Sequence, residues 1–188
     1  MSEERDLGPI YGFQWRHFGA EYNNHDTNYS NQGYDQLSSL VQKLNSNPND
    51  RRMLVNAWNP NDLDKMALPP CHYSFEVNVS DEKLNLKWNQ RSVDTMLGLP
   101  FNIASYGTLL TLLANEANLE QGILTGHLGD THIYENHIDY AKTQLMRKPL
   151  SLPDLRIKNF TSIFDWTSED IDLENYQSYQ KIKFPIAI

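Results

Sequence analysis

The chain contains a single cysteine, Cys71, and two interpretations of it are open. It follows Pro69-Pro70 and precedes a segment in which polar and apolar residues alternate. A free cysteine in a folded protein is usually a small buried apolar side chain. It becomes a nucleophile when a nearby cation lowers its pKa. Arg91 lies on the predicted partner strand, which can bring its guanidinium back toward Cys71, and this favours the nucleophile.

Basic side chains elsewhere in the sequence form a candidate phosphate site. Arg51-Arg52 is a basic pair in an acidic chain, and it precedes a predicted strand. Such a pair is commonly solvated surface, but planar guanidinium groups also suit phosphate oxygens. Arg91 and Ser92 could complete the site. Because consecutive side chains of a strand point to opposite faces, at most one arginine of the pair can share the face of the residues that follow.

Asn102, which follows Pro100-Phe101 in a long apolar segment, is a candidate for recognising a nucleobase. A partly buried amide must be hydrogen-bonded, and it presents a donor beside an acceptor. That pair of groups can complement the edge of a uracil ring. The long segment itself is expected to be core.

We predict no metal site. His132 and His137 are five residues apart, whereas metal-binding helices of the H-E-x-x-H type space their histidines by four. One cysteine cannot supply a zinc set. Gly126 and Gly129 precede a strand-like segment rather than a helix, so they do not match a phosphate-binding glycine loop.

Periodicity predicts the elements that must position these groups. The clearest signal is a hairpin whose strands, 73–79 and 84–88, both alternate strictly. Further strands are expected over 52–58, 132–134 and 155–157, helices over 34–44, 102–117 and 135–147, and an Asn-rich loop over 22–33. Strands mixed with helices, including a hairpin, predict an α+β domain rather than a regular βαβ array.

Size and charge narrow the class of protein. The chain has 188 residues, which suits one domain, and its net charge is −8. Duplex-binding domains normally carry the opposite sign, so a general nucleic-acid-binding role is disfavoured. No apolar run approaches the ~18 residues of a membrane span, and the charged first ten residues do not resemble a signal peptide. We expect a cytoplasmic protein without a disulfide.

Five segments of the chain resemble the thymidylate synthase family, in the family's order. They are LGPIYGFQWRHFGAEY (7–22), DRRMLVNAWNPNDLDKMALPPCH (50–72), QRSVDTMLGLPFNIASY (90–106), GDTHIYENH (129–137) and FPIAI (184–188). The resemblance covers nearly the whole chain. It implies a mixed twisted sheet with packed helices and one sheet face at a dimer interface.

The resemblance also implies an activity, the reductive methylation of dUMP to dTMP. The cosubstrate, 5,10-methylenetetrahydrofolate, supplies the carbon and the hydride and leaves as dihydrofolate. Cys71 would add to C6 of uracil, Tyr11 would help a water remove the C5 proton, and Asn102 would hold N3–H and O4. Arg91 would contact both the phosphate and the thiolate.

Further residues would bind the two ligands. Arg51 and Arg52 would reach the phosphate of the neighbouring subunit in an obligate homodimer. The other expected dUMP contacts are Gln90, Arg91, Ser92, Asp94, His132 and Tyr134. The expected folate contacts are Asp94, Leu97, Gly98 and Phe101, together with Ile186 and Ala187 near a C-terminus that closes over the ligands.

One departure from the family bears on activity. Family members typically carry a further N-terminal portion, with an arginine loop, a glutamate that organises proton-transfer waters, and a tryptophan that packs on the folate. We therefore interpret residues 1–188 as one domain that forms the C-terminal two thirds of the family fold. The rest would lie on a separate fragment or elsewhere, and without it the acid–base contribution of about 10²–10⁴-fold would be lost.

Two alternatives remain open. The first is a hydroxymethylase of the same fold acting on deoxyuridylate. Deoxycytidylate is a weaker candidate because an aspartate is expected in place of Asn102 in enzymes that act on it. The second is a non-enzymatic remnant that binds nucleotide or another protein. The retained Cys71, Arg91, Asn102, His132 and Tyr134 argue against the remnant.

Overall fold

The computed structural model describes residues 6–186. Its α-helices are α1 (Gly12–His17), α2 (Gln36–Ser46), α3 (Gly98–Glu116) and α4 (Ile138–Leu145). Its strands are β1 (Leu54–Asn56), β2 (His72–Ser80), β3 (Lys83–Asp94), β4 (Glu120–His132), β5 (Asp154–Ile157) and β6 (Ile171–Glu174). Short 3₁₀ turns lie at Leu63–Lys65, Glu135–His137 and Ser168–Asp170. No helix in this part of the chain is long and apolar enough to cross a bilayer.

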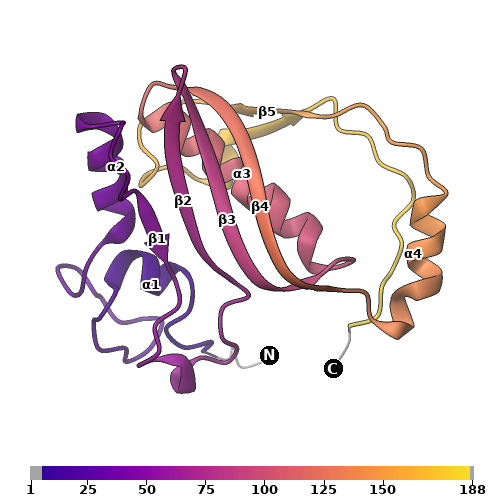
Figure 1. Ribbon diagram of the computed structural model, residues 1–188, viewed down its shortest axis with the longest axis horizontal. Helices are drawn as coiled ribbons and strands as arrows, with labels where there is room; N and C mark the ends of the chain where they lie inside the picture. Colours follow the sequence, from indigo (N-terminus) through magenta and orange to yellow (C-terminus); the bar gives the residue numbers. More distant parts are fainter. Residues whose placement is uncertain (1–5, 187–188) are drawn as a thin grey trace.

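The site is built on a mixed four-stranded sheet in the order β1-β2-β3-β4 (Figure 1). The pairs β1–β2 and β2–β3 are antiparallel, whereas β3 and β4 are parallel and are joined by the crossover helix α3. Antiparallel β5 and β6 form a separate ribbon. The sheet is strongly twisted and α3 crosses behind it, while α4 stands apart from the sheet, beyond the end of β4 (Figure 1). The predicted α+β class with a mixed sheet is confirmed.

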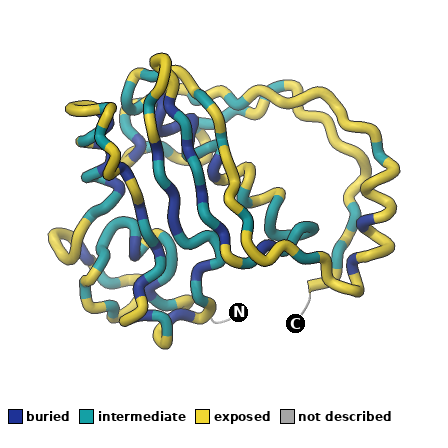
Figure 2. The backbone as a smooth tube through the Cα atoms, in the orientation of Figure 1, coloured by how far each residue is buried: buried dark blue, intermediate teal, exposed yellow. Residues whose placement is uncertain are grey.

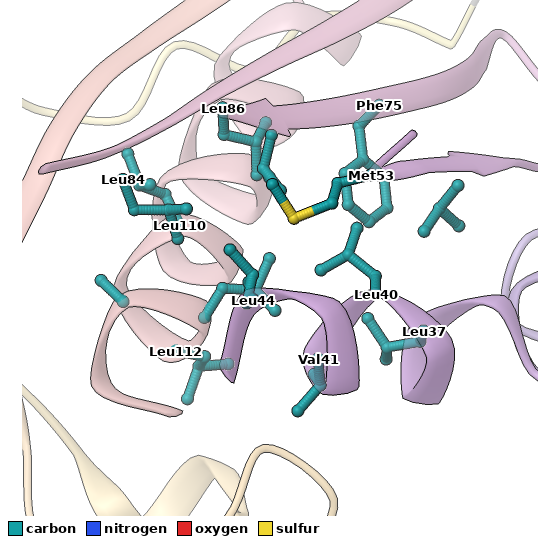
Figure 3. Close-up of a cluster of buried hydrophobic side chains, with 14 of the residues drawn as sticks. Leu37, Leu40, Val41, Leu44, Met53, Phe75, Leu84, Leu86, Leu110 and Leu112 are labelled. Carbon is teal, nitrogen blue, oxygen red and sulfur yellow. The ribbon is translucent and has the colours of Figure 1, made fainter. Parts of the chain in front are cut away.

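The hydrophobic core lies on the α3 side of the sheet. In the hairpin register Phe75 faces Trp88 and Val77 faces Leu86, so the apolar residues of both strands point to one side. Leucines of α2 and α3 meet them there (Figure 3). The opposite face of the hairpin is polar, with an ion pair between Glu76 and Lys87. The strict alternation of apolar and polar residues in the hairpin therefore arises because one face of its strands is buried and the other is open to solvent.

The largest correction to the sequence-based expectations concerns β4. A strand is expected over 132–134, but β4 spans Glu120–His132 and ends where that strand should begin. Glycines at 122, 126 and 129 lower the strand propensity of this segment. Parallel pairing with β3 holds it in place nevertheless. Its residues are mostly exposed, so it lacks the apolar alternation that reveals a half-buried strand (Figure 2).

Smaller corrections affect element ends. The strand expected over 52–58 is reduced to β1, and helix 102–117 begins earlier, at Gly98. The helix expected over 135–147 divides into a 3₁₀ turn and α4. Helix α1 and strand β6 are not predicted by the sequence, because both are too short for a clear periodic signal.

Gly126 of β4 is needed because the ring of Trp88 lies against it. A Cβ atom at Gly126 would lie 2.5 Å from Cζ2 of Trp88, whereas one at Gly12 would meet nothing within 4 Å. We expect Gly126→Ala to lower the free energy of unfolding by about 1–3 kcal/mol, since Trp88 must leave its packed position. Gly12→Ala is the matched control and should cause no loss. Urea unfolding of both variants measures the difference, and equal effects would contradict this account of Gly126.

Candidate active site

Cys71 lies immediately before β2 and is half-buried. Its backbone N–H donates to the hydroxyl of Tyr11 at 3.0 Å. Its carbonyl accepts from the backbone N–H of Arg91 at 2.8 Å. The preceding residues Pro69 and Pro70 have no N–H to donate and fix their φ angles. The cysteine is thus held by the start of the β2–β3 hairpin on one side and by Tyr11 on the other.

The guanidinium of Arg91 returns to the segment that carries Cys71, as the hairpin predicts. Its Nε donates to the carbonyl of Pro70 at 3.0 Å, and Nη2 donates to that of Pro69 at 2.9 Å. It also lies over the ring of Trp58, 5.4 Å from the centroid. Two of the five guanidinium N–H groups are engaged by these carbonyls. Arg91 is exposed, so this fixed cation stands at the protein surface beside the Pro69-Pro70 segment that leads into Cys71.

Tyr11 has an unusual backbone, with φ 27° and ψ −91° just before α1. Non-glycine residues rarely adopt a positive φ, and such strain is concentrated at functional sites. The phenol stacks on His72, with ring centroids 4.3 Å apart and planes inclined by 17°. Burial raises the pKa of Tyr11. The phenol therefore stays protonated and keeps an O–H to donate next to Cys71.

His72 is a neighbour of the site that sequence reasoning does not select. Its Nδ1 lies 2.9 Å from the hydroxyl oxygen of Tyr106 on α3. Burial lowers the pKa of His72 to about 4. The imidazole is therefore neutral near pH 7 and connects Tyr11 to α3 without adding a charge. In the sequence, only the position of His72 directly after Cys71 indicates that it belongs to the site.

The lowered pKa of His72 predicts a pH-dependent stability. The unfolded chain protonates this imidazole near its ordinary pKa of 6.5, whereas the folded chain does so only near 4. The unfolded state thus binds more protons between these values, and stability falls as the pH drops from 6.5 to 4. The full effect is on the order of 3 kcal/mol. Urea unfolding across this window should show a smaller loss in His72→Gln than in the wild type. The same substitution at exposed His127 is the control, and an equal reduction there would contradict the prediction.

Asn102 stands in the first turns of α3, and its amide is held by β3. Nε2 of Gln90 donates to Oδ1 of Asn102 at 3.0 Å and to the carbonyl of Ser92 at 3.0 Å. The indole Nε1 of Trp88 donates to Oε1 of Gln90 at 3.1 Å. Gln90 and Trp88 are buried. The amide of Asn102 is therefore partly buried and paired, as predicted, and Trp88 is a member of the set that sequence reasoning misses.

The start of α3 brings other expected residues to Asn102. Oδ1 of Asp94 accepts from the backbone N–H groups of Met96 and Leu97, at 3.0 and 3.1 Å. A Cβ atom at Gly98 would lie 3.5 Å from Cβ of Asp94 and 3.8 Å from Oδ1 of Asn102. Phe101 is 72% exposed. Asp94 and Gly98 thus adjoin Asn102, and Phe101 projects outward.

The parallel pairing of β3 and β4 places His132 at this end of the sheet. Asp94 and His132 are register partners. The ring of His132 meets that of Tyr134 edge to face, with centroids 5.0 Å apart. Nδ1 of His132 also lies 3.3 Å from Oδ1 of Asp130. His132 and Tyr134, two of the expected dUMP contacts, therefore lie next to the Asp94 end of β3.

Arg51 and Arg52 lie far from this group in the same chain. Leu54 pairs with Glu76, so the two arginines precede β1 at the hairpin-turn end of β2, opposite to Cys71. Both are exposed, and Arg52 is 3.9 Å from a carboxylate oxygen of Asp50. The two arginines are solvated surface groups within this chain.

The C-terminal segment is tied to the 3₁₀ turn before α4. Nε2 of buried His137 lies 2.6 Å from the carbonyl oxygen of Pro185, and Ile186 is 81% exposed. Ala187 lies outside the described residues. A cleft of about 830 Å³ opens between this segment, α4 and the start of α3. The residues that line it include Met96, Pro100 and Phe184, but Asp94, Leu97, Gly98, Phe101 and Ile186 are not among them.

Within residues 6–186 no three or more His, Cys, Asp or Glu side chains come together as a metal site. Instead, a phenol and a guanidinium lie at the segment that carries Cys71. The oriented amide of Asn102 is held by Gln90, the register partner of His72. Together they define an α+β protein with a cysteine-centred polar site at one end of a mixed sheet.

Comparison with known proteins identifies the family. The sequence model for "Thymidylate synthase" matches residues 1–188. The chain is 50% identical to a bifunctional dihydrofolate reductase-thymidylate synthase of Paramecium tetraurelia, over 99% of this chain and 40% of the relative. It is 49% identical to a thymidylate synthase of Herpesvirus ateles, over 99% of this chain and 64% of the relative. The corresponding values for a Homo sapiens thymidylate synthase are 48%, 99% and 60%. The chain belongs to the thymidylate synthase family, and it spans less than two thirds of the length of these relatives.

Proposed function

We propose that the chain acts as a thymidylate synthase, converting dUMP to dTMP with 5,10-methylenetetrahydrofolate as cosubstrate and releasing dihydrofolate. The observation that carries the proposal is the juxtaposition of the half-buried Cys71 with the Tyr11 phenol and the anchored Arg91 guanidinium. An oriented amide at Asn102 lies on the same sheet end. Family membership adds support, since the relatives bear the name of this activity.

In this proposal each group has a defined chemical task. The thiolate of Cys71 adds to C6 of the uracil ring, which makes C5 an enolate-like carbon able to attack the one-carbon unit. Arg91 favours the thiolate and binds phosphate oxygens. Asn102 holds N3–H and O4, and Tyr11 helps a water to remove the C5 proton. The cosubstrate supplies the carbon, and the bond from this carbon to the folate breaks once the C5 proton has left. The folate then transfers the hydride that completes the methyl group, and the thiolate of Cys71 leaves C6.

The remaining expected contacts complete the two ligand sites. Gln90, Ser92 and Asp94 would serve the dUMP side together with His132 and Tyr134. Asp94, Leu97, Gly98 and Phe101 would form one wall of the folate site at the start of α3, closed by Ile186 and Ala187. The exposure of Phe101 suits a wall that a flat ligand covers.

We further propose a homodimer that acts in the cytoplasm. Arg51 and Arg52 lie at the opposite end of β2 from Cys71, which suits a reach into the partner's phosphate site. The open face of the sheet carries exposed Ile123 and Leu54, at 69% and 47%. A C2 interface on that face would cover both apolar side chains. The single free cysteine suits a reducing compartment.

Tritium release from C5-labelled dUMP tests the function. Release that depends on methylenetetrahydrofolate and yields dihydrofolate in equal amount is the expected result. Because the chain spans under two thirds of its relatives, the assay is run with and without the remaining N-terminal part of a relative as a separate fragment. Release without dihydrofolate would indicate hydroxymethylation instead. No release under either condition would contradict both enzymatic functions.

A further inference from the structure

The amide of Gln90 is held in one orientation by a fixed group on each side. The indole N–H of Trp88 donates to its Oε1 at 3.1 Å, and its Nε2 donates to the carbonyl of Ser92 at 3.0 Å. An indole nitrogen can only donate and a carbonyl oxygen can only accept. If O and N of the Gln90 amide were exchanged, its NH₂ group would face the indole N–H of Trp88, donor against donor. Its oxygen would face the carbonyl oxygen of Ser92, acceptor against acceptor.

This orientation is passed on to Asn102. The second N–H of Gln90 Nε2 donates to Oδ1 of Asn102 at 3.0 Å. Oδ1 of Asn102 keeps one acceptor position, and Nδ2 keeps its two donors. If the Asn102 amide were exchanged, its NH₂ group would face the N–H of Gln90. The hydrogen-bond series Trp88–Gln90–Asn102 thus begins at a group that can only donate, and it determines which atom of Asn102 accepts.

The packing around Trp88 keeps its N–H directed at Gln90. The indole is only 4% exposed and stacks on Tyr106, with ring centroids 5.3 Å apart and planes inclined by 9°. Gly126 leaves room for the other side of the ring. Trp88 and Gln90 are two residues apart on β3, so both side chains point to the same face of the sheet. The indole cannot turn away without repacking the core.

We infer that Trp88 is a positioning residue for base selection, because it holds Asn102 in the orientation that accepts uracil and rejects cytosine. The inference rests on the function proposed above. Uracil presents O4 as acceptor and N3–H as donor, whereas cytosine presents an amino donor and an unprotonated N3 acceptor. An exchanged Asn102 amide would suit cytosine. Discrimination between uracil and cytosine therefore depends on the free-energy cost of exchanging O and N of the Asn102 amide. The hydrogen bonds from Trp88 through Gln90 determine that cost.

Trp88→Phe tests the inference because it keeps an aromatic ring and removes the N–H. The buried Oε1 of Gln90 then lacks its donor, and such losses correspond to about a 5- to 150-fold change in an equilibrium. We expect the ratio of dUMP to dCMP affinity, measured by calorimetry on the full chain, to fall by that factor. Trp15→Phe is the matched control, since Trp15 packs against Phe75 of the same core. It should leave the ratio unchanged.

A second variant and a ligand-free measurement separate the outcomes. Replacing the indole at position 88 by benzothiophene preserves the ring shape and removes only the N–H, so it serves if Trp88→Phe fails to fold. Without nucleotide, the side-chain amide NMR signals of Gln90 and Asn102 should shift in both variants and stay in place in Trp15→Phe.

A merely structural role of Trp88 would weaken dUMP and dCMP binding equally. If the wild-type protein prefers dUMP, a variant at position 88 with an unchanged ratio of dUMP to dCMP affinity would overturn the inference. Amide signals that do not move in these variants would overturn it as well. Shifted amide signals in a protein that binds neither nucleotide would uphold the hydrogen-bond series, while contradicting the proposed function and base selection with it.

Discussion

Replacing Cys71 by serine is expected to abolish tritium release from C5-labelled dUMP, with a loss of more than about 10³-fold. A serine hydroxyl has nearly the shape of the thiol but is a far weaker nucleophile at neutral pH. The backbone bonds of position 71 to Tyr11 and Arg91 do not involve the side chain, so the fold and nucleotide affinity should be retained. The expected signature is bound dUMP without turnover.

The single cysteine makes this prediction unusually easy to control. A thiol-alkylating reagent can label only position 71, since the chain has one cysteine. Labelling should inactivate the wild type, bound dUMP should slow it, and Cys71→Ser should take up no label. Mass spectrometry of the denatured nucleotide complex should show a covalent adduct in the wild type alone. Residual turnover in Cys71→Ser near the wild-type rate would refute the covalent mechanism.

Asn102→Asp is expected to reverse the preference between the two pyrimidines. A carboxylate offers only acceptors, so O4 of uracil would face an oxygen while the amino group of cytosine would find a partner. Gln90 can still donate to the new side chain, which confines the change to the side that faces the base. We expect kcat/KM for dUMP to fall by about 10²-fold or more. Affinity for dCMP should rise relative to dUMP.

The control for this charge change is Asn31→Asp in the exposed loop between α1 and α2. Asn31 has a positive φ of 64°, which aspartate also tolerates, and the substitution adds the same negative charge away from the site. It should leave both nucleotide affinities unchanged. If Asn102→Asp behaved like this control, Asn102 would not be the residue that reads the base.

The hairpin and its consequence for Arg91 can be predicted from the sequence because alternation sets the register locally. Strands 73–79 and 84–88 are recognisable, and pairing them returns Arg91 to the segment before Cys71. Strand β4 cannot be recognised in the same way, since its stability comes from parallel pairing with β3 rather than from its own composition. Parallel pairs join segments that are distant in the sequence, which periodicity does not detect.

The site, like the fold, can be predicted from the sequence only in part. Residue type and position in the sequence are enough to indicate Cys71, Arg91 and Asn102. The tyrosine that meets Cys71 is 60 residues away, and no spacing rule connects them. Alternation assigns Trp88 to the apolar face correctly, but a hydrogen bond from a core indole to Gln90 depends on side-chain rotation that alternation does not specify. The family resemblance therefore adds residues that the patterns alone cannot select.

The bond between the Cys71 amide and Tyr11 has a consequence for the order of folding. It closes a loop of 60 residues, and the entropy cost of closing loops delays such contacts relative to hairpins and helices. The hairpin can therefore form before the phenol reaches the cysteine. A chain that has formed only the hairpin would already bring Arg91 to the segment before Cys71 but would lack the phenol of Tyr11. The complete site would then appear only with the final tertiary contacts, and exchange of the Cys71 amide proton would report the moment when they form.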